Sequence, residues 1–393
     1  MDDTLDLLRA AGRITPQCIE LRRAIHRVPE IGNAEFRTSA LIADCLEGLG
    51  LHVEHPMGTS VVATLSGQQP GPTVAFRADM DALRIQEATG LPFSSEVPGF
   101  MHACGHDFHC AGLLGTAMLL STLRERLHGS VKLLFQPDEE GLGGAQRMIA
   151  AGCLQNVDAV FGAHVDPDLP SGTVGLKYGK MYAASDTFRV VIHGEGSHGA
   201  QPEDGIDAIA IGAQVITALQ QLVSRRISPT DSAVVSVGTF HAGTQMNTIA
   251  DSAVLEGILR TLGQETRAKV RKWFAHTVEG ICESMGARAE IHMRESYPGI
   301  VNHDDMVELV KSAAAQALGP QAIRILPSPT MGTEDFGYFL LERPGAFYRI
   351  GVGESAIGAD KPLHSPRFIA DEAAMSALIA LHASVALRFL AAR

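Results

Sequence analysis

Seven consecutive residues, CGHDFHC at positions 104–110, include two cysteines, two histidines and one aspartate. Thiolate, imidazole and carboxylate groups hold divalent metal ions in proteins, so this segment is a candidate metal site. The Cys-x-His spacing of Cys104 and His106 is not that of a zinc finger. A redox pair of Cys104 and Cys110 is an alternative, but their spacing is not the C-x-x-C of thiol oxidoreductases. We expect Cys110 to be a packed thiol, and His102 and His109 to be loop or supporting residues. A metal site here therefore needs ligands from elsewhere in the chain.

Three apolar segments of the first half also end in residues that can bind metals. They are TVAFRADMDAL, VKLLFQPDEEG and DAVFGAHVD, which end at Asp79 and Asp81, at Asp138, Glu139 and Glu140, and at His164 and Asp166. Ligands of open α/β sheets bind beyond the carboxyl ends of the strands. We therefore expect one crevice in which a divalent ion is held by Cys104, His106, Glu140 and His164. Taken alone, Asp79 or Asp166 is more simply interpreted as a surface carboxylate.

Glu139 and Glu140 are adjacent carboxylates at the end of a predicted strand. Neighbouring side chains of an extended segment point in different directions, so one carboxylate can hold a metal ion while the other faces a bound water. A carboxylate beside a metal-bound water is the arrangement that a general base needs in hydrolysis. The pair therefore predicts a hydrolytic site.

The elements that must position these residues follow from the alternation of apolar runs and helical patterns. We predict helices over 16–27, 38–49, 111–127 and 143–151, and strands over 60–67, 73–79, 131–136 and 158–165. Strands that are apolar throughout and separated by helices are typical of a buried, mostly parallel sheet. The first part of the chain is therefore predicted to be an α/β domain with helices flanking its central sheet.

The pattern changes near residue 185 to the order β-α-β-β-α-β. The predicted elements are a strand at 186–194, a helix at 204–223, strands at 233–241 and 252–262, a helix at 265–285 and a strand at 287–295. This order is the ferredoxin-like split unit. We interpret 185–296 as a second domain inserted into a first domain that comprises 1–184 and 297–393.

Composition excludes several classes of function. A chain of 393 residues suggests two domains, and a net charge of −12 without a long basic block argues against a nucleic-acid partner. Six scattered cysteines fit reduced thiols. No apolar run reaches eighteen residues, and the acidic start MDDTLDLL lacks the order of a signal peptide. We therefore expect a cytoplasmic protein without a membrane partner.

From about residue 20 to its end, the chain resembles the aminoacylase/hippurate hydrolase branch of the dinuclear metallopeptidases, which is related to carboxypeptidase G. The segments that carry the resemblance are, in order, RADMDAL, MHACGHDFHCAGLLG, FQPDEEGLGGA, GAHVDPDLPSG, GEGSHGAQPEDGIDAI, MGTEDFGYF and LHSPRF. The branch includes N-acyl-amino-acid amidohydrolases and auxin-conjugate hydrolases. The resemblance implies metal-dependent hydrolysis of the amide bond of N-acyl-L-amino acids by a metal-activated water.

The resemblance also implies a role for individual residues. Glu139 is the general base, Asp81 supports a metal ligand, and His198 polarises the scissile carbonyl, often from the partner subunit. Asn247 and Arg260 face the substrate carboxylate. The five metal ligands are Cys104, which bridges both ions, with His106, Glu140, His164 and His364. The chain departs from the family pattern at NTIA (247–250), where Asn-Val-Ile-Pro is common, and at Asp138, where a small residue is common.

The resemblance also implies that 1–184 and 297–393 form a catalytic domain with two divalent ions per subunit. It implies that 185–296 is a lid and dimerisation domain through which a homodimer forms. A cysteine ligand favours zinc, whereas carboxylate and imidazole donors also accept manganese, cobalt or nickel. A dipeptidase, or a deacetylase of an intermediate such as N-acetyl-diaminopimelate, is an alternative enzyme. A catalytically silent binding relative is a third interpretation, but the five ligand positions and Glu139 are all present.

Overall fold

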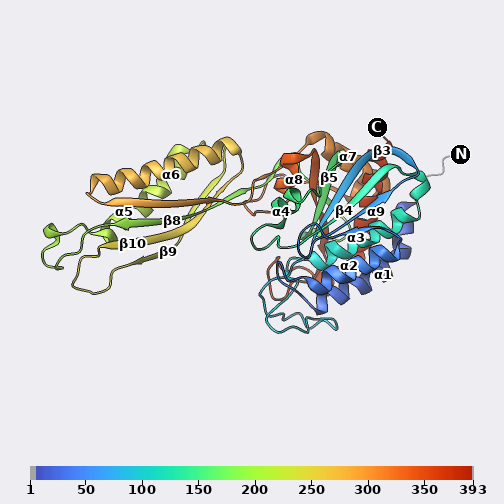
Figure 1. Ribbon diagram of the computed structural model, residues 1–393, viewed down its shortest axis with the longest axis horizontal. Helices are drawn as coiled ribbons and strands as arrows, with labels where there is room; N and C mark the ends of the chain where they lie inside the picture. The colour runs from blue at the N-terminus through green and yellow to red at the C-terminus, as the bar shows by residue number, and fades with distance from the viewer. Residues whose placement is uncertain (1–5, 392–393) are drawn as a thin grey trace. The chain divides into compact units, whose positions relative to one another are not determined.

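Eight strands form the central sheet of the first of two units into which the chain divides (Figure 1). The computed structural model describes residues 6–391, and this unit comprises the described parts of Met1–Gly179, Asn302–Pro327 and Tyr338–Arg393. The strand order is β1-β2-β4-β3-β5-β14-β6-β13. The bounds are β1 Val53–Glu54, β2 Val61–Ser66, β3 Gln69–Asp79, β4 His128–Gln136, β5 Ala159–Pro170, β6 Val174–Leu176, β13 Ile323–Ile325 and β14 Gly345–Gly353.

The centre of this sheet is parallel. Strand β3 pairs in parallel with β4 and with β5, β5 with β14, and β13 with β6. The pairs β1–β2, β2–β4 and β6–β14 are antiparallel. The central strands are apolar because both faces are covered: Phe76 of β3 and Phe161 of β5 are fully buried, and their rings stack with centroids 5.8 Å apart. The α/β class expected from the sequence is confirmed.

The helices of the first unit are α1 (Leu7–Arg27), α2 (Phe36–Gly48), α3 (His106–Ser121), α4 (Gly144–Ala150), α7 (Asp304–Leu318), α8 (Gly337–Glu342) and α9 (Met375–Ala391). Glycines allow α3 to approach its neighbours closely. A Cβ at Gly112 would lie 2.4 Å from Leu378 of α9, and one at Gly115 would lie 2.7 Å from Cys18 of α1. Helices α1, α3 and α9 therefore pack into one layer with little room for larger side chains.

One helical segment, Glu372–Ala391, is long and apolar enough to cross a membrane by those two criteria. Within the protein, however, 78% of its most apolar window is buried. This is the situation of a core helix, because the apolar side chains of α9 pack against β3, β4 and the neighbouring helices.

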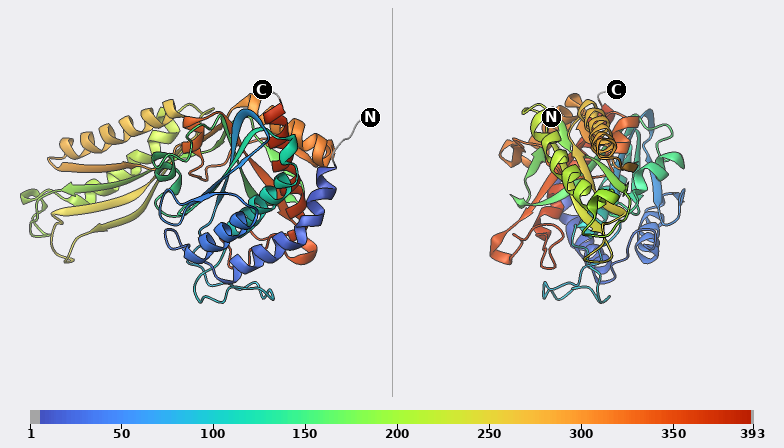
Figure 2. Two further views of the ribbon diagram at one scale, coloured as in Figure 1. Left: turned by 45° about the vertical axis from the view of Figure 1, so that its right-hand side comes forward. Right: turned by 90° about the vertical axis from the view of Figure 1, so that its left-hand side faces the viewer.

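The second unit comprises Lys180–Val301 and Ser328–Gly337. Its antiparallel sheet has the order β11-β8-β10-β9, with β8 at Ala184–His193, β9 at Ala233–Ala242, β10 at Ser252–Thr261 and β11 at Arg288–Glu295. Helices α5 (Ala208–Arg226) and α6 (Gln264–Ser284) lie side by side on one face of this sheet (Figures 1 and 2). The chain first enters the unit through β7 (Gly179–Tyr182) and leaves it through β12 (Ile300–Asn302), which pair with each other. It returns to the unit for Ser328–Gly337. The predicted βαββαβ order is confirmed.

Two helices begin at least five residues earlier than predicted. Helix α1 starts at Leu7 rather than at 16, and Pro16 lies inside it. Leu7 and Ala11 are buried and extend the apolar face of the helix beyond the predicted start. Helix α3 starts at His106 rather than at 111, because Gly105 in the left-handed conformation marks the preceding cap.

Candidate metal centre

The turn at Cys104, Gly105 and His106 is fixed by its glycine. Gly105 has a φ of 82° and precedes the first residue of α3. A Cβ at this position would also lie 2.4 Å from Cγ2 of Val165 on β5. Only glycine meets both conditions without strain. The turn therefore places Cys104 and His106 on either side of the start of a helix, and both are buried against β5.

Strand β5 ends beside this turn and contributes His164. The Sγ atom of Cys104 lies 3.3 Å from Nε2 of His164. Nδ1 of His164 lies 2.8 Å from the carbonyl oxygen of Val165 and donates to it, which leaves a lone pair on Nε2. Cys104, His106 and His164 form a candidate ligand group, since their donor atoms lie within 4.8 Å of one another.

A second candidate group shares Cys104. It consists of Cys104, Glu140 and His364, again with donor atoms within 4.8 Å of one another. Nε2 of His364 lies 3.1 Å from Oε1 of Glu140. His364 has a φ of 64°, and its backbone N–H donates to the carbonyl oxygen of Ala103 at 2.8 Å. The His364 segment is thus tied to the turn that carries Cys104.

Asp81 orients the paired acids after β4. Its two carboxylate oxygens accept the backbone N–H groups of Glu139 at 3.1 Å and of Glu140 at 2.9 Å. Its Oδ1 also lies 3.3 Å from Nδ1 of His106. Donor atoms of His106, Glu139 and Glu140 lie within 4.8 Å of one another. The carboxylate of Asp81 therefore positions both glutamates and also faces His106, a candidate ligand.

The donor set fits a cation. In the part of the chain that the structure describes, the buried ring nitrogens of His106 and Oε1 of Glu140 make no hydrogen bond of regular geometry, although Nδ1 of His106 faces Asp81 at 3.3 Å and Oε1 of Glu140 faces His364 at 3.1 Å. Burial, followed by the charges of Glu140 and Glu139, raises the pKa of Cys104 well above its usual value. Burial also lowers the pKa of His164 well below its usual value, which keeps that imidazole neutral. A divalent ion would satisfy these atoms and stabilise the thiolate.

His109 is a supporting residue, one of the two roles expected for it, whereas the part of Asp79 as its partner was not predicted from the sequence. Nε2 of His109 accepts the N–H of Val165 at 2.9 Å, so its Nδ1 carries the proton and donates to Asp79 at 2.6 Å. Arg77 pairs with the other oxygen of Asp79 at 2.5 Å. The interpretation of Asp79 and Asp166 as surface carboxylates is wrong: both are buried, and Asp166 pairs with Arg349 at 2.7 Å. The Arg77–Asp79 pair has a signal in the sequence, because residues two apart on one strand point to the same face of the sheet.

Cys110 and Asp138 have structural surroundings. Cys110 is fully buried in α3, and its Sγ donates to the carbonyl oxygen of Asp79 at 3.0 Å. Asp138 has a φ of 59° and a buried carboxylate that pairs with Arg147 at 2.5 Å. Asp138 therefore does not point to solvent, and its charge is balanced next to Glu139.

The remaining sequence-predicted site residues belong to the second unit. His198 is exposed, and its Nδ1 accepts the N–H of Ala200 at 3.1 Å. The N–H of Gly199 donates to the carbonyl oxygen of Asn247 at 2.7 Å, so the loops that carry His198 and Asn247 lie side by side. Arg260 on β10 is half-buried, which lowers its pKa, and one of its terminal nitrogens has no hydrogen-bond partner among the described residues.

Comparison with known proteins identifies the family. Residues 75–388 match the model of peptidase family M20/M25/M40, and the chain belongs to this family. An N-acyl-L-amino acid amidohydrolase of Geobacillus stearothermophilus is 43% identical over 76% of this chain and 82% of that protein. Thermostable carboxypeptidase 1 of Saccharolobus solfataricus is 39% identical over 99% of both chains. The crystal structure of YXEP from Bacillus subtilis, a dinuclear metal-binding peptidase of family M20, superposes with a TM-score of 0.87 at 37% identity, covering 97% of this chain and 99% of that one.

The family and the donor groups together define the class of the protein. It is a metal-dependent hydrolase of the amidohydrolase and peptidase type. The likeness in fold extends over both units, since the YXEP superposition covers 97% of the chain.

Proposed function

We propose that this protein hydrolyses the amide bond of N-acyl-L-amino acids and releases a carboxylic acid and a free amino acid. The observation that carries the proposal is the pair of donor groups that share Cys104 beside Glu139. Relatives named N-acyl-L-amino acid amidohydrolase and N-acetyl-L-cysteine deacetylase, at 43% and 41% identity, favour this substrate class.

Two divalent ions are part of the proposal. Cys104, His106 and His164 would hold one ion, and Cys104, Glu140 and His364 the other, with the thiolate shared. When bound, such ions polarise the amide carbonyl and lower the pKa of water. A ligand set with one thiolate favours zinc, and its imidazole and carboxylate members also suit manganese, cobalt or nickel.

The chain's own residues then move the proton and orient the substrate. The Glu139 carboxylate takes a proton from the attacking water and delivers it to the leaving nitrogen. Asp81 holds the backbone of Glu139 and Glu140, so the two carboxylates keep separate directions. In the second unit, Nδ1 of His198 accepts an N–H, so its Nε2 carries the proton and can donate to the carbonyl oxygen.

Asn247 and Arg260 complete the proposed substrate site. Arg260 has a terminal nitrogen without a hydrogen-bond partner among the described residues, and a guanidinium recognises a carboxylate through paired N–H groups. Asn247 lies on the loop beside His198. We infer that they bind the carboxylate of the amino-acid part.

We also propose that the protein is a cytoplasmic homodimer formed through the second unit. Its two sheet edges differ: β11 carries Arg288, Glu290, Arg294 and Glu295, whereas β9 (AVVSVGTFHA) has no Lys, Arg, Asp, Glu or Pro. Charged residues protect an edge strand from pairing, and β9 lacks them. A second copy could therefore pair along β9, next to the exposed Phe240 and Met246.

The proposal is tested by a substrate panel on metal-free protein reconstituted separately with zinc, manganese, cobalt and nickel. N-acetyl and N-benzoyl amino acids, dipeptides and longer peptides are compared by release of free amine. We expect the highest kcat/KM for an N-acyl amino acid. A clear preference for peptides would favour the carboxypeptidase or dipeptidase alternative, which the 39% identical carboxypeptidase supports. No hydrolysis with any metal would contradict the proposal.

A further inference from the structure

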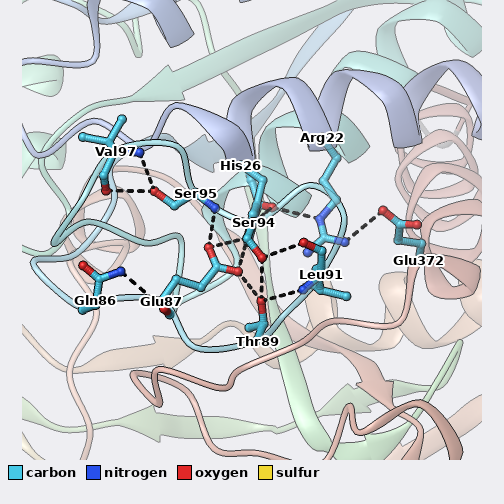
Figure 3. Close-up of polar contacts among 11 residues, drawn as sticks. Arg22, His26, Gln86, Glu87, Thr89, Leu91, Ser94, Ser95, Val97 and Glu372 are labelled. Atoms are coloured by element: carbon cyan, nitrogen blue, oxygen red, sulfur yellow. Dashed lines mark hydrogen bonds and ion pairs between the residues drawn. The ribbon is translucent and has the colours of Figure 1, made fainter.

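Residues 84–101 form a loop without helix or strand between the end of β3 and the CGHD turn. The loop is built around the side chain of Glu87, which is 2% exposed (Figure 3). Its carboxylate accepts the hydroxyl of Thr89 and, at 2.6 Å, the backbone N–H of Ser95. A loop of this length inside a compact unit usually has a functional role.

His26 of α1 connects this loop to α3. Its Nε2 lies 3.3 Å from Oε1 of Glu87, and its Nδ1 lies 2.8 Å from Oδ2 of Asp107. Its side chain is 1% exposed, and the ring meets the edge of Phe93 with centroids 5.5 Å apart. The imidazole is therefore buried between two carboxylates that belong to different segments.

The geometry determines the charge of this ring. A carboxylate only accepts hydrogen bonds, so two carboxylates facing two ring nitrogens require both nitrogens to be donors. Burial by itself lowers the pKa of His26, but Asp107 and Glu87 outweigh it, and the net direction is upward. Burial raises the pKa of Glu87, yet His26 and the Thr89 hydroxyl bring it down to about 2. His26 is thus an imidazolium between two ionised acids.

The neighbouring charges balance this cation. Arg22 of α1 pairs with Asp107 at 2.8 Å and with Glu372 at 3.0 Å, and Arg23 pairs with Glu372 at 2.6 Å. His102 is buried, its ring centroid lies 6.3 Å from that of His26, and both of its ring nitrogens lack a hydrogen-bond partner among the described residues. The cluster therefore holds three cations, Arg22, Arg23 and His26, and four anions, Glu87, Asp107, Glu372 and, on the exposed side of Arg23, Glu20.

The segments that His26 joins are those that carry the candidate metal ligands. Asp107 follows His106 directly, and the loop runs into the segment that contains Cys104. The N–H of Ala88 donates at 2.8 Å to the carbonyl oxygen of Pro366, two residues after His364. Loss of the contact between His26 and Glu87 would therefore loosen the 84–101 loop, which connects to the segment of Cys104 and is hydrogen-bonded to the segment of His364.

We propose that His26 is a positioning residue for the metal centre: its imidazolium ties Glu87 of the 84–101 loop to Asp107 of α3 and thereby fixes the backbone that carries Cys104, His106 and His364. This inference rests on the proposed metal-dependent function. It predicts that His26 influences metal affinity without touching the metal, as supporting partners of ligands commonly do.

The charge state is tested on metal-free protein by ¹⁵N-detected NMR of the histidine rings at pH 7.5. The resonances of His26 are identified by their absence from the spectrum of His26→Gln. We expect both ring nitrogens to be protonated in the wild type and one to lose its proton in Glu87→Gln. A neutral His26 ring in the wild type would overturn the proposal.

The positioning role is tested by zinc affinity, measured by competition with a chromophoric chelator and without substrate. His26→Gln and Glu87→Gln should each weaken binding by on the order of 10-fold. The double variant should bind no more weakly than His26→Gln alone, because the contact that Glu87→Gln removes is already absent when His26 is replaced. Glu96→Gln is the matched control: it makes the same charge change at an exposed position of the same loop and should leave the affinity unchanged.

The outcomes separate this inference from the proposed function. Wild-type affinity in both Glu87→Gln and His26→Gln would overturn the positioning role alone. Absence of zinc binding by the wild type would contradict the metal-dependent function, and the positioning role with it. If His26→Gln fails to fold, as judged by circular dichroism, Glu87→Gln still decides, because Gln preserves the size of the side chain and removes only the charge.

Discussion

Cys104 is the residue on which the proposed metal centre would depend most, because its thiol belongs to both candidate donor groups. The other members contribute to one group with Cys104, and each is held by a contact of its own. His164 donates to a carbonyl oxygen, Glu140 is held by Asp81, and the backbone of His364 is bonded to Ala103. Removal of Cys104 should therefore weaken the binding of both ions.

Substitution of Cys104 by Ala should remove most of the bound metal and of the activity. Cys110→Ala is the matched control, since that thiol is buried and bonded to a backbone carbonyl. It should retain metal and turnover and lose only about 1–2 kcal/mol of unfolding free energy. Metal content by mass spectrometry and amine release decide. A Cys104→Ala protein with full metal content and turnover would refute the shared-thiolate assignment.

The two glutamates should separate binding from proton transfer. Glu140→Ala removes a ligand and should lower metal occupancy. Glu139→Gln keeps the backbone contact with Asp81 and should retain the ions, while kcat falls by about 10²–10⁴ because the base is lost. Equal loss of metal in both variants would show that the division of roles is incorrect.

At the residue level, the sequence revealed ligand types rather than their supports. Cys104, His106, Glu140 and His164 stand out because donors cluster at the ends of apolar runs, whereas His364 was identified only by resemblance. His26 could not be recognised, because its partners Asp107 and Glu87 are 81 and 61 residues away. Long-range polar pairs leave no local pattern in a single chain.

At the level of elements, the buried strands were predictable and the helix starts were not. Strand β4 was predicted at 131–136 and is observed at His128–Gln136, because apolar residues on both faces produce a continuous run. The start of α3 depends on the left-handed Gly105, whose requirement comes from the closeness of Val165 on β5. Such tertiary constraints override the local signal at element ends.

Helix α9 carries a buried histidine that should make stability fall in acid. Burial and the nearby His109 lower the pKa of His382 to about 3. The unfolded chain takes up a proton near pH 6.5 while the folded chain does not, so stability is lost as the pH falls from about 6.5 towards 3. The slope contributed by one such group is about 1.4 kcal/mol per pH unit.

His382→Gln should therefore flatten the pH dependence of unfolding. Between pH 6.5 and 4.5, the metal-free variant should lose roughly 2–3 kcal/mol less unfolding free energy than the wild type in urea titrations. His52→Gln, the same change at an exposed position, should leave the slope unchanged. Identical slopes for His382→Gln and wild type would contradict a neutral buried His382.

At the scale of the whole molecule, the chain places its candidate ligands in one unit and His198, Asn247 and Arg260 in the other. An inserted unit can close over substrate and exclude water. In a dimer, the same residues could instead serve the partner's centre. The sequence predicted the βαββαβ order of the second unit, but a single chain carries no pattern that distinguishes these two arrangements.

A mixed dimer distinguishes the two arrangements. His198→Ala should retain metal and lose most of kcat, about 10²–10³, because a carbonyl donor is missing. The variant is co-expressed with Glu139→Gln under two affinity tags, and heterodimers are purified. If His198 acts across the interface, each heterodimer regains one working site and activity returns to about half of the wild-type value per dimer. Heterodimers without activity would show that His198 acts in its own subunit.

The central claim is that hydrolysis depends on metal ions held by the groups that share Cys104. The most direct measurement is a titration of metal-free protein with zinc or manganese while release of free amine from an N-acyl-L-amino acid is followed. The account predicts no turnover without metal, and activity that rises to a plateau at two ions per chain. Hydrolysis that is independent of added metal, or a protein that binds no ion at micromolar concentration, would contradict it.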